Sequence, residues 1–251
     1  MQRVTTDPLA ALAELPGVFE AVDSARAAVD GLLREPVLRR GRGEVRAESR
    51  RRAAWASACL AGVDVPAANF DAPFAADEPG RLSAASLRLA GEVRTLSDTW
   101  RRAPMQALAR LHTLAAVDVT DPDALGRPRP DPAVAQRLAG LADMVTTSGA
   151  SGVVVAAVVH GELLDLRPFG WGDELIARAA ARLVLVSRGV DPDALTVPEE
   201  GLLELGRDGY DTALAAYQSG TPDGMAIWLI HNAAALQRGA TIARNLCSAR
   251  R

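Results

Sequence analysis

Residues 166–178, LRPFGWGDELIAR, decide how the rest of the chain is interpreted. A proline, two glycines and a tryptophan form a short loop that runs directly into two acids and a helical pattern. Such loops are typical of phosphate sites, because the free N–H groups and the dipole at a helix N-terminus attract anions. The stretch therefore predicts either a nucleotide site or the remains of one.

The helices predicted on either side of this loop are unusually apolar. Residues 150–165 carry Val, Ala and Leu around most of the helix circumference, which is typical of a central, buried helix. Residues 174–188 have a broad apolar stripe with arginines interspersed, and Gly189 provides a C-terminal stop. We expect the loop to be held rigidly between two core helices.

Helical spacing of apolar residues continues outward over almost the whole chain, and proline or glycine interrupts it at intervals. The composition agrees, because 49% hydrophobic residues with only 4% aromatics suits close-packed Ala/Leu helices better than a sheet. We predict an all-α fold of about 8–10 helices, with N-terminal helices in 1–80 and a helical core in 81–251 that form one compact unit. The predicted helices lie near 7–14, 18–34, 44–61, 81–100, 104–117, 132–146, 150–165, 174–188, 200–219 and 223–248.

Charge argues against nucleic acid as a partner, since the net charge is -3 and the pI is about 5.7. The basic cluster at 38–52 is interpreted as an exposed loop and helix start, because no aromatic residues interleave it. Every basic residue is Arg, which indicates coding bias in a GC-rich genome and favours a bacterial protein.

We expect a cytoplasmic protein without a membrane partner. Cys59 and Cys247 lie far apart and form neither a disulfide framework nor a metal pattern. The N-terminus lacks the apolar segment of a signal peptide, and the longest apolar stretch is too short and too often interrupted to span a bilayer.

Residues 156–192, AAVVHGELLDLRPFGWGDELIARAAARLVLVSRGVDP, resemble the signature region of Fic (Fido) domain proteins, whose motif reads HPFxxGNGRxxR. Pro168, Phe169, Gly172 and Arg178 match the motif without a gap, and His160 matches the histidine of the preceding AxxHxxFxxI helix. Weaker similarity to the family extends over 107–116 and 210–246. The resemblance implies a Fic-like helical bundle and an ancestral activity that transfers AMP from ATP to a target hydroxyl.

The chain departs from this motif at four positions that carry the chemistry. Arg167 replaces the histidine that deprotonates the target, and a guanidinium has no lone pair with which to accept a proton. Asp173 replaces the asparagine that helps to hold metal and phosphates. Glu174 replaces the second glycine, and Leu175 replaces the first arginine.

Electrostatics sharpens this interpretation. Asp173 is predicted to be the N-cap of the helix, with its carboxylate on the free N–H groups. Glu174 adds a second charge and is expected to pair with Arg178 four residues later. The two carboxylates would then occupy the place of a phosphate, so we expect no cofactor and no retained nucleotide or Mg²⁺ binding.

Two further regions agree with the resemblance. Many Fic proteins have an inhibitory helix with the pattern (S/T)xxxE(G/N), and residues 55–66 match it at Ser57 and Gly62 but carry Ala61 at the glutamate position. The β-hairpin flap on which Fic enzymes dock their targets corresponds to VTDPDALGRPRPDP, 119–132. Its prolines disfavour strands, so the flap is predicted to be shortened or lost.

The remaining candidates are the histidines and a tryptophan. None of His112, His160 and His231 has metal-ligand spacing with another, so no metal site is predicted. His160 is interpreted as a core or pocket-wall residue, and it is the only spare base near the loop. Trp171 is either a lid over the pocket or a plug that fills it, and we favour the plug.

The sequence favours a degenerate Fic-like pseudoenzyme without AMP transfer, whose partner is another protein, with homo-oligomers left open. One alternative is an enzyme with altered nucleotide or phosphate-compound chemistry in the same pocket, and another is a helical protein-interaction module. No catalytic residue is assigned, apart from His160 as the spare base. The candidate ligand-binding residues are Arg167, Pro168, Phe169, Gly170, Trp171, Gly172, Asp173, Glu174 and Arg178.

Overall fold

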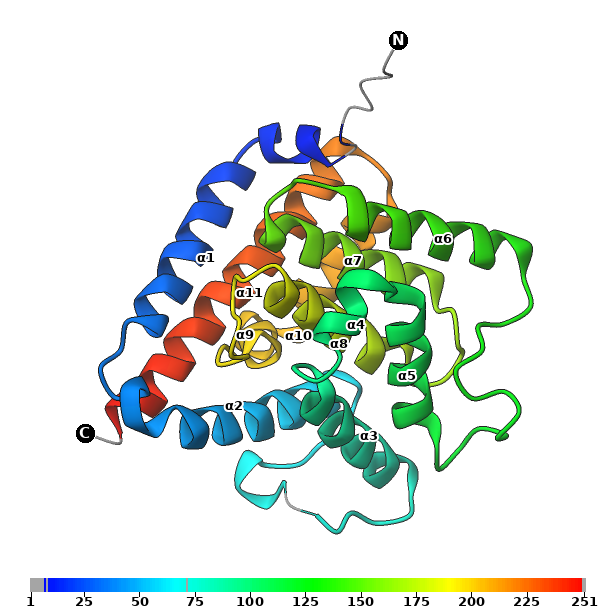
Figure 1. Ribbon diagram of the computed structural model, residues 1–251, viewed down its shortest axis with the longest axis horizontal. Coiled ribbons are helices and arrows are strands. Elements are labelled where there is room, and N and C mark those ends of the chain that lie inside the picture. Colours follow the sequence, from blue (N-terminus) through cyan, green and yellow to red (C-terminus); the bar gives the residue numbers. More distant parts are fainter. Residues whose placement is uncertain (1–6, 8, 71, 250–251) are drawn as a thin grey trace.

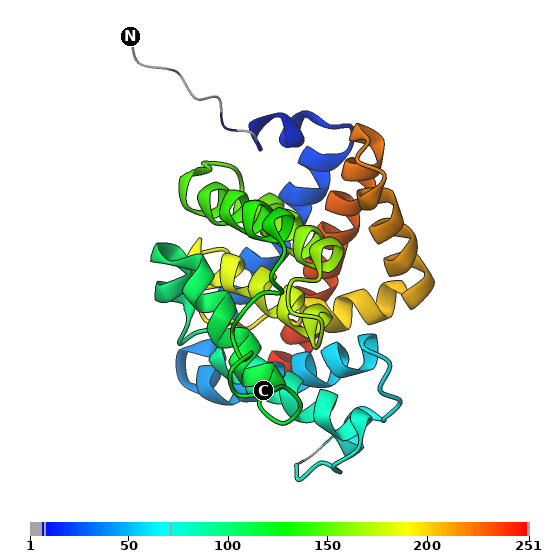
Figure 2. The ribbon, with the colours of Figure 1, turned by 90° about the vertical axis from the view of Figure 1, so that its right-hand side faces the viewer.

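The computed structural model describes residues 7, 9–70 and 72–249, which form eleven α-helices, two short 3-10 helices and no strand (Figures 1 and 2). The all-α prediction is therefore confirmed. Residues 1–6 and 8, where the predicted N-terminal unit and the helix 7–14 begin, lie outside the described residues. The elements are η1 (Ala10–Glu14), α1 (Val18–Leu33), α2 (Leu38–Leu60), η2 (Ala67–Asn69), α3 (Glu78–Glu92), α4 (Ser97–Arg102), α5 (Pro104–Ala116), α6 (Pro132–Thr147), α7 (Gly152–Leu166), α8 (Asp173–Ser187), α9 (Pro198–Leu205), α10 (Arg207–Gln218) and α11 (Pro222–Ser248).

Several helices begin where an oxygen-bearing side chain precedes a proline in the first turn. Asp77 accepts a hydrogen bond from the N–H of Gly80 at the start of α3, and Asp131 accepts one from Ala133 at the start of α6. Thr221 does the same for Gly224 at the start of α11. Each cap satisfies an N–H that the helix leaves unpaired, and proline at the first positions costs no hydrogen bond.

Helix α7 lies in the middle of the bundle and packs against α8, while α1 runs beside the long α11 at one edge and α2 beside α3 at another (Figure 1). All residues of α7 are buried except Glu162 and Asp165. A Cβ atom at Gly161 would lie 2.8 Å from Nε1 of Trp228, so only glycine lets α7 and α11 approach this closely. Trp228 then donates to the carbonyl of Ala157 at 2.7 Å.

Two helices predicted as continuous are each divided. The segment 81–100 contains most of α3 and the first residues of α4. The segment 200–219 contains most of α9 and all of α10, which are separated by Gly206 at φ 89°. Apolar periodicity continues across both breaks, which is why the sequence pattern did not reveal them.

The basic segment 38–52 was predicted as a loop and a helix start, and this was wrong. It is helical from Leu38 onward as part of α2. Leu38 and Val45 are buried against Leu32 and Leu195, so an apolar stripe anchors the segment although its other faces carry arginines.

The region of the expected flap, residues 117–131, contains turns and no strand. Its only ladder-like contact is the N–H of Arg129, which donates to the carbonyl of Pro168 at 2.8 Å. The flap is therefore absent in this described segment, as the prolines predicted.

One buried apolar cluster contains residues from both sides of position 80, such as Val18, Leu60 and Leu183. The division into 1–80 and 81–251 remains a prediction. Neither Cys59 nor Cys247 forms a disulfide. Among the described helices, none is both long and apolar enough to cross a bilayer.

Candidate functional site

The loop between α7 and α8 is built from a sequence of left-handed turns. Arg167 follows the last residue of α7 at φ 46°, and its N–H donates to the carbonyl of Leu163 at 3.0 Å. Gly170 and Gly172 also have positive φ values, 86° and 72°, which glycine adopts without the penalty that a side chain incurs. These turns reverse the chain within six residues and aim the loop amides at a common point.

The carboxylate of Asp173 occupies that point. Its Oδ1 accepts from the N–H of Phe169 at 3.0 Å, and its Oδ2 accepts from the N–H of Gly170 at 2.7 Å. The side chain is 4% exposed. Burial raises the pKa of Asp173, and the two amides and the charges of Arg167 and Arg129 oppose that shift. The protein's own carboxylate therefore satisfies these two loop amides.

Asp173 was predicted to be the N-cap of α8, and this was wrong in detail. The cap is Gly172, which has no side chain, and Asp173 is the first helical residue. From that position its carboxylate reaches back to the loop amides rather than forward to the helix amides. The N–H groups that the carboxylate satisfies belong to the loop that precedes the helix.

Arg129 braces the same loop from the segment that replaces the flap. Its Nη2 donates to the carbonyl of Leu166 at 3.1 Å and its Nε to that of Arg167 at 3.3 Å. Together with the backbone bond to Pro168, these contacts satisfy carbonyls at the exposed C-terminus of α7.

Arg178 joins the loop helix to the end of α2. It is 2% exposed, and its Nε and Nη2 donate to Oγ and to the carbonyl of Ser57, both at 2.9 Å. The predicted pair with Glu174 is present at 3.9 Å. The segment that resembles an inhibitory helix thus contacts the last motif arginine through Ser57, while Ala61 offers no carboxylate.

The aromatic residues of the loop pack against neighbouring helices. Phe169 stacks on His112 with ring centroids 4.4 Å apart, and Nδ1 of His112 accepts from the N–H of Gly126. Trp171 is half-buried and donates from Nε1 to Glu78 at 3.0 Å. Trp171 therefore braces the loop against α3, which differs from the plug that we favoured.

A pocket of about 170 Å³, open to solvent, lies between the loop, the end of α2 and α10. Of the predicted ligand-binding residues it is lined by Arg167, Asp173 and Glu174. The others, Pro168, Phe169, Gly170, Trp171, Gly172 and Arg178, do not line it.

Sequence reasoning missed the wall that α10 contributes to this pocket. Arg207, Asp211, Leu214 and Gln218 line it, as does Tyr210. Positions 207, 211 and 218 carry polar side chains at helical spacing along α10, and this pattern was the available signal.

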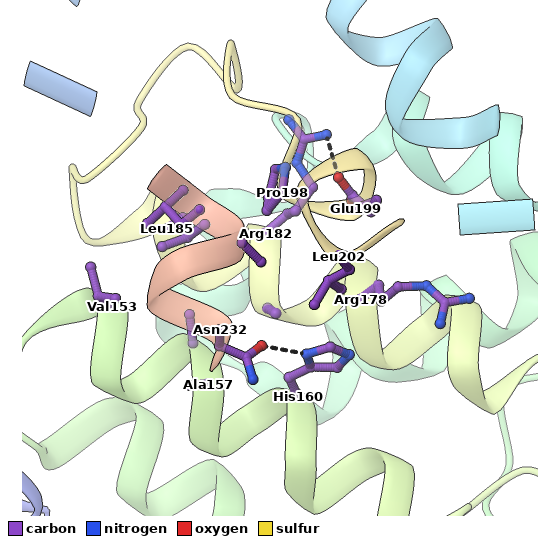
Figure 3. Close-up of a pocket in the computed structure, with 14 residues that line it drawn as sticks. Val153, Ala157, His160, Arg178, Arg182, Leu185, Pro198, Glu199, Leu202 and Asn232 are labelled. Carbon is purple, nitrogen blue, oxygen red and sulfur yellow. Dashed lines mark hydrogen bonds and ion pairs between the residues drawn. The ribbon is translucent and has the colours of Figure 1, made fainter. Parts of the chain in front are cut away.

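His160 lies behind the loop, in the wall of a separate small cavity of about 40 Å³ between α7, α8, α9 and α11 (Figure 3). Its Nδ1 lies 2.8 Å from Oδ1 of Asn232, and its Nε2 lies 2.9 Å from the hydroxyl of Tyr210. Asn232 donates from Nδ2 to the carbonyl of Trp228, so its oxygen faces the ring and Nδ1 carries the proton. Burial lowers the pKa of His160 to about 3. Both ring nitrogens are used within the core, and the ring is neutral.

The far wall of this cavity holds a buried ion pair, in which Nη1 of Arg182 lies 3.5 Å from Oε2 of Glu199 (Figure 3). Burial raises the pKa of Glu199. No group of three or more His, Cys, Asp or Glu residues in the described part of the chain is arranged to hold a metal ion.

No sequence-family model and no curated protein matches the chain. Solved structures do match it. A Fic family protein from Desulfovibrio desulfuricans G20 aligns with a TM-score of 0.71 and 19% identity, covering 90% of this chain and 74% of that one. Residues 134–508 of Fic-1 from C. elegans align with a TM-score of 0.69 and 16% identity, covering 91% and 73%.

A Fic domain-containing signaling protein from Bacteroides thetaiotaomicron VPI-5482 aligns over 91% of this chain and 98% of its own, with a TM-score of 0.64 and 14% identity. At such identities the likeness shows the fold. The chain has the fold of Fic-domain proteins.

Proposed function

We propose that this Fic-fold protein has lost AMP transfer and acts as a pseudoenzyme that binds another protein. The observation that carries the proposal is the carboxylate of Asp173 on the N–H groups of Phe169 and Gly170. Charge-assisted bonds of this kind are about twice as strong as neutral ones. A phosphate would have to displace the carboxylate from these amides against the repulsion between the two negative charges.

The other motif positions support the same proposal. Arg167 is exposed and offers no lone pair, so it does not activate a hydroxyl. Leu175, at the position of a phosphate-binding arginine, is 1% exposed and belongs to the main apolar core. An arginine there would bury an unpaired charge, which is costly. The leucine at position 175 therefore contributes to the packing of the apolar core.

Partner binding in place of catalysis is also in keeping with the region of the flap. The segment 117–131 offers no strand edge for a target chain, because it contains only turns and is joined to the loop by Arg129. A partner must therefore dock by side-chain contacts rather than by adding a strand.

Incubation with radiolabelled ATP tests the proposal. The wild-type protein is expected to transfer no label to itself or to proteins of a cell lysate. The matched variant is Arg167→His, Asp173→Asn and Glu174→Gly together, with Leu175 retained to preserve the core. This variant is expected to gain measurable ATP binding by calorimetry. Label transferred by the wild type and abolished by Asp173→Ala would overturn the proposal.

A second candidate function has one observation in its favour, the open pocket that Arg167, Asp173 and Glu174 share with Arg207 and Asp211. Charges of both signs around such a pocket suit a small zwitterionic or metal-bound ligand. A thermal-shift screen of nucleotides, phosphorylated metabolites and divalent ions tests it. A response that Arg207→Ala removes supports altered ligand chemistry, and the absence of any response excludes it for those compounds.

A further inference from the structure

Helices α2 and α3 run next to each other on one side of the molecule (Figures 1 and 2). A groove of about 310 Å³ lies between them. Four arginines line it: Arg46 and Arg50 from α2, Arg94 after α3, and Arg182 from α8. The other lining residues are small or neutral, and none is acidic. We call this feature the arginine groove.

The arginine groove contains more positive than negative charge. Asp193 at its margin pairs with Arg42 at 2.9 Å and with Arg46 at 4.0 Å. Within the described part of the chain, Arg50 and Arg94 make no ion pair and no side-chain hydrogen bond. Their guanidinium groups are therefore available to a ligand.

Arg182 closes the inner end of the groove and is fixed in place. It is 4% exposed, and its Nη2 donates to the carbonyls of Ala194 and Thr196, both at 3.0 Å. Its pairing with Glu199 offsets part of its charge. The groove thus combines one buried, hydrogen-bonded cation with exposed cations at Arg50 and Arg94, an arrangement that suits a multiply charged anion.

The backbone is unusually accessible along this groove. Gly43, Ala47, Ala90 and Gly91 contribute to its lining. A Cβ atom added at Gly43 or Gly91 would meet no other atom within 4 Å, so open space adjoins both helices. Small residues therefore leave room for a ligand between the arginines.

The cations and the space indicate the class of ligand. A guanidinium binds phosphate oxygens through two parallel hydrogen bonds, and a tetrahedral phosphate accepts such pairs from two opposite sides. A planar carboxylate offers one face of this kind. The lining contains no aromatic ring on which a nucleobase could stack, which disfavours single-stranded nucleic acid.

We propose that the arginine groove binds a small molecule that carries a di- or triphosphate group. This site is distinct from the loop pocket, because Arg46 and Arg50 lie near the middle of α2, whereas Ser57 and Leu60 at its end face Arg178 and the loop pocket. The proposal is independent of whether the loop has retained any activity.

Calorimetric titration of the full chain with inorganic triphosphate at low salt tests the site. The wild type is expected to bind, and Arg50→Ala with Arg94→Ala is expected to weaken binding at least about tenfold. The matched control is Arg26→Ala with Arg110→Ala, which removes the same charge from two exposed positions elsewhere. Equal weakening by the control pair, or no binding by the folded wild type at about 1 mM triphosphate, would overturn the proposal.

Two further variants test the geometry. Gly91→Leu is expected to fill the groove and abolish binding without lowering the melting temperature, because open space surrounds its Cβ. Asp193→Asn is expected to strengthen binding several-fold, because it releases Arg42 and Arg46. Undiminished binding by a folded Gly91→Leu variant would contradict the site.

Comparison of ligands fixes the chemistry. Pyrophosphate, a nucleoside diphosphate and inorganic triphosphate share the proposed group, and their ranking shows whether the rest of the ligand contributes. Citrate binding as tightly as triphosphate would show that phosphate is not required. A short oligonucleotide that binds more tightly through Arg50 and Arg94 would overturn the small-molecule assignment.

Discussion

The loop that precedes α8 and the arginine groove treat negative charge in opposite ways. In the loop, Asp173 supplies a carboxylate to the amides of Phe169 and Gly170. In the groove, Arg50 and Arg94 have no counter-charge from the described chain. A site that is internally satisfied stabilises the fold, whereas an unsatisfied one costs stability and gains from a ligand. The effects of substitutions on the free energy of unfolding should therefore differ between the two regions in sign as well as in size.

The largest effect is expected from Asp173→Ala. It leaves the amides of Phe169 and Gly170 without a partner, so the free energy of unfolding should fall by about 2 to 3 kcal/mol. Urea unfolding measures it, with Glu204→Ala as the control, since that exposed residue pairs with the equally exposed Arg238 at 3.7 Å. The control should change stability by less than about 0.5 kcal/mol. Equal effects of the two substitutions would remove the contrast between loop and groove.

Acid should destabilise the core on which the loop rests. His160 is neutral in the fold with a pKa of about 3, against 6.5 for the unfolded chain, because burial disfavours its charged form. Protons therefore favour the unfolded chain, and stability from this group is lost as the pH falls from 6.5 toward 3, by about 1.4 kcal/mol per pH unit. Imidazole resonances followed by NMR should show His160 neutral at pH 5. A midpoint near 6.5 for this ring would contradict the buried hydrogen bonds.

Arg129→Ala should lower the free energy of unfolding by about 1 kcal/mol. The carbonyls of Leu166 and Arg167 would lose a charged hydrogen-bond donor and would be left to bind water instead. Arg127→Ala, two residues away and exposed, is the control and should be neutral. Amide hydrogen exchange provides a second measurement, since the loop amides should exchange faster only in the Arg129 variant. An unchanged loop would mean that the segment at 117–131 does not brace it.

Arg167→Gly should be stabilising by about 0.5 to 1 kcal/mol, because glycine adopts φ 46° without the steric cost of a side chain. Arg167→Ala keeps the Cβ atom and should give no such gain. Thermal unfolding of both variants distinguishes relief of backbone strain from removal of a positive charge. Equal gains from both would assign the effect to charge.

The smallest effect on stability should come from Arg50→Ala with Arg94→Ala in the groove. Removal of two unpaired like charges should leave the free energy of unfolding within about 0.5 kcal/mol of the wild type, and toward greater stability at low salt. Salt titration of the melting temperature checks the sign. A clear loss of stability would mean that these arginines are structural, as Arg182 is.

Local patterns were sufficient to predict much of the fold. The helices predicted near 132–146 and 223–248 begin at Pro132 and Pro222 in the structure, where a cap and a proline act within one turn. Gly206 was missed because a glycine inside a periodic apolar pattern is usually tolerated, and here its positive φ ends α9. The helical start at Leu38 was missed because its anchor, Leu195, lies far along the chain.

The contacts of the loop could likewise be predicted only in part from the sequence. The sequence indicated that acids replace the phosphate-binding residues and that Glu174 meets Arg178. It did not indicate which amides Asp173 satisfies, because that depends on Gly172 acting as the cap. The contact of Arg178 with Ser57 joins residues 121 positions apart, and the arginine groove brings together α2, α3 and α8. Such arrangements follow from tertiary packing rather than from any local pattern.

Because of Asp173, the conformation of the loop does not depend on binding an anion from the surrounding solution. Tethered three and four residues from the amides that it binds, its carboxylate is present at an effective concentration that no dissolved anion matches. A bound solute stabilises a protein only by mass action, in proportion to the logarithm of its concentration. On the proposed function, a loop that carries its own anion folds identically whether phosphate compounds are scarce or abundant, and nucleotides add nothing to its stability.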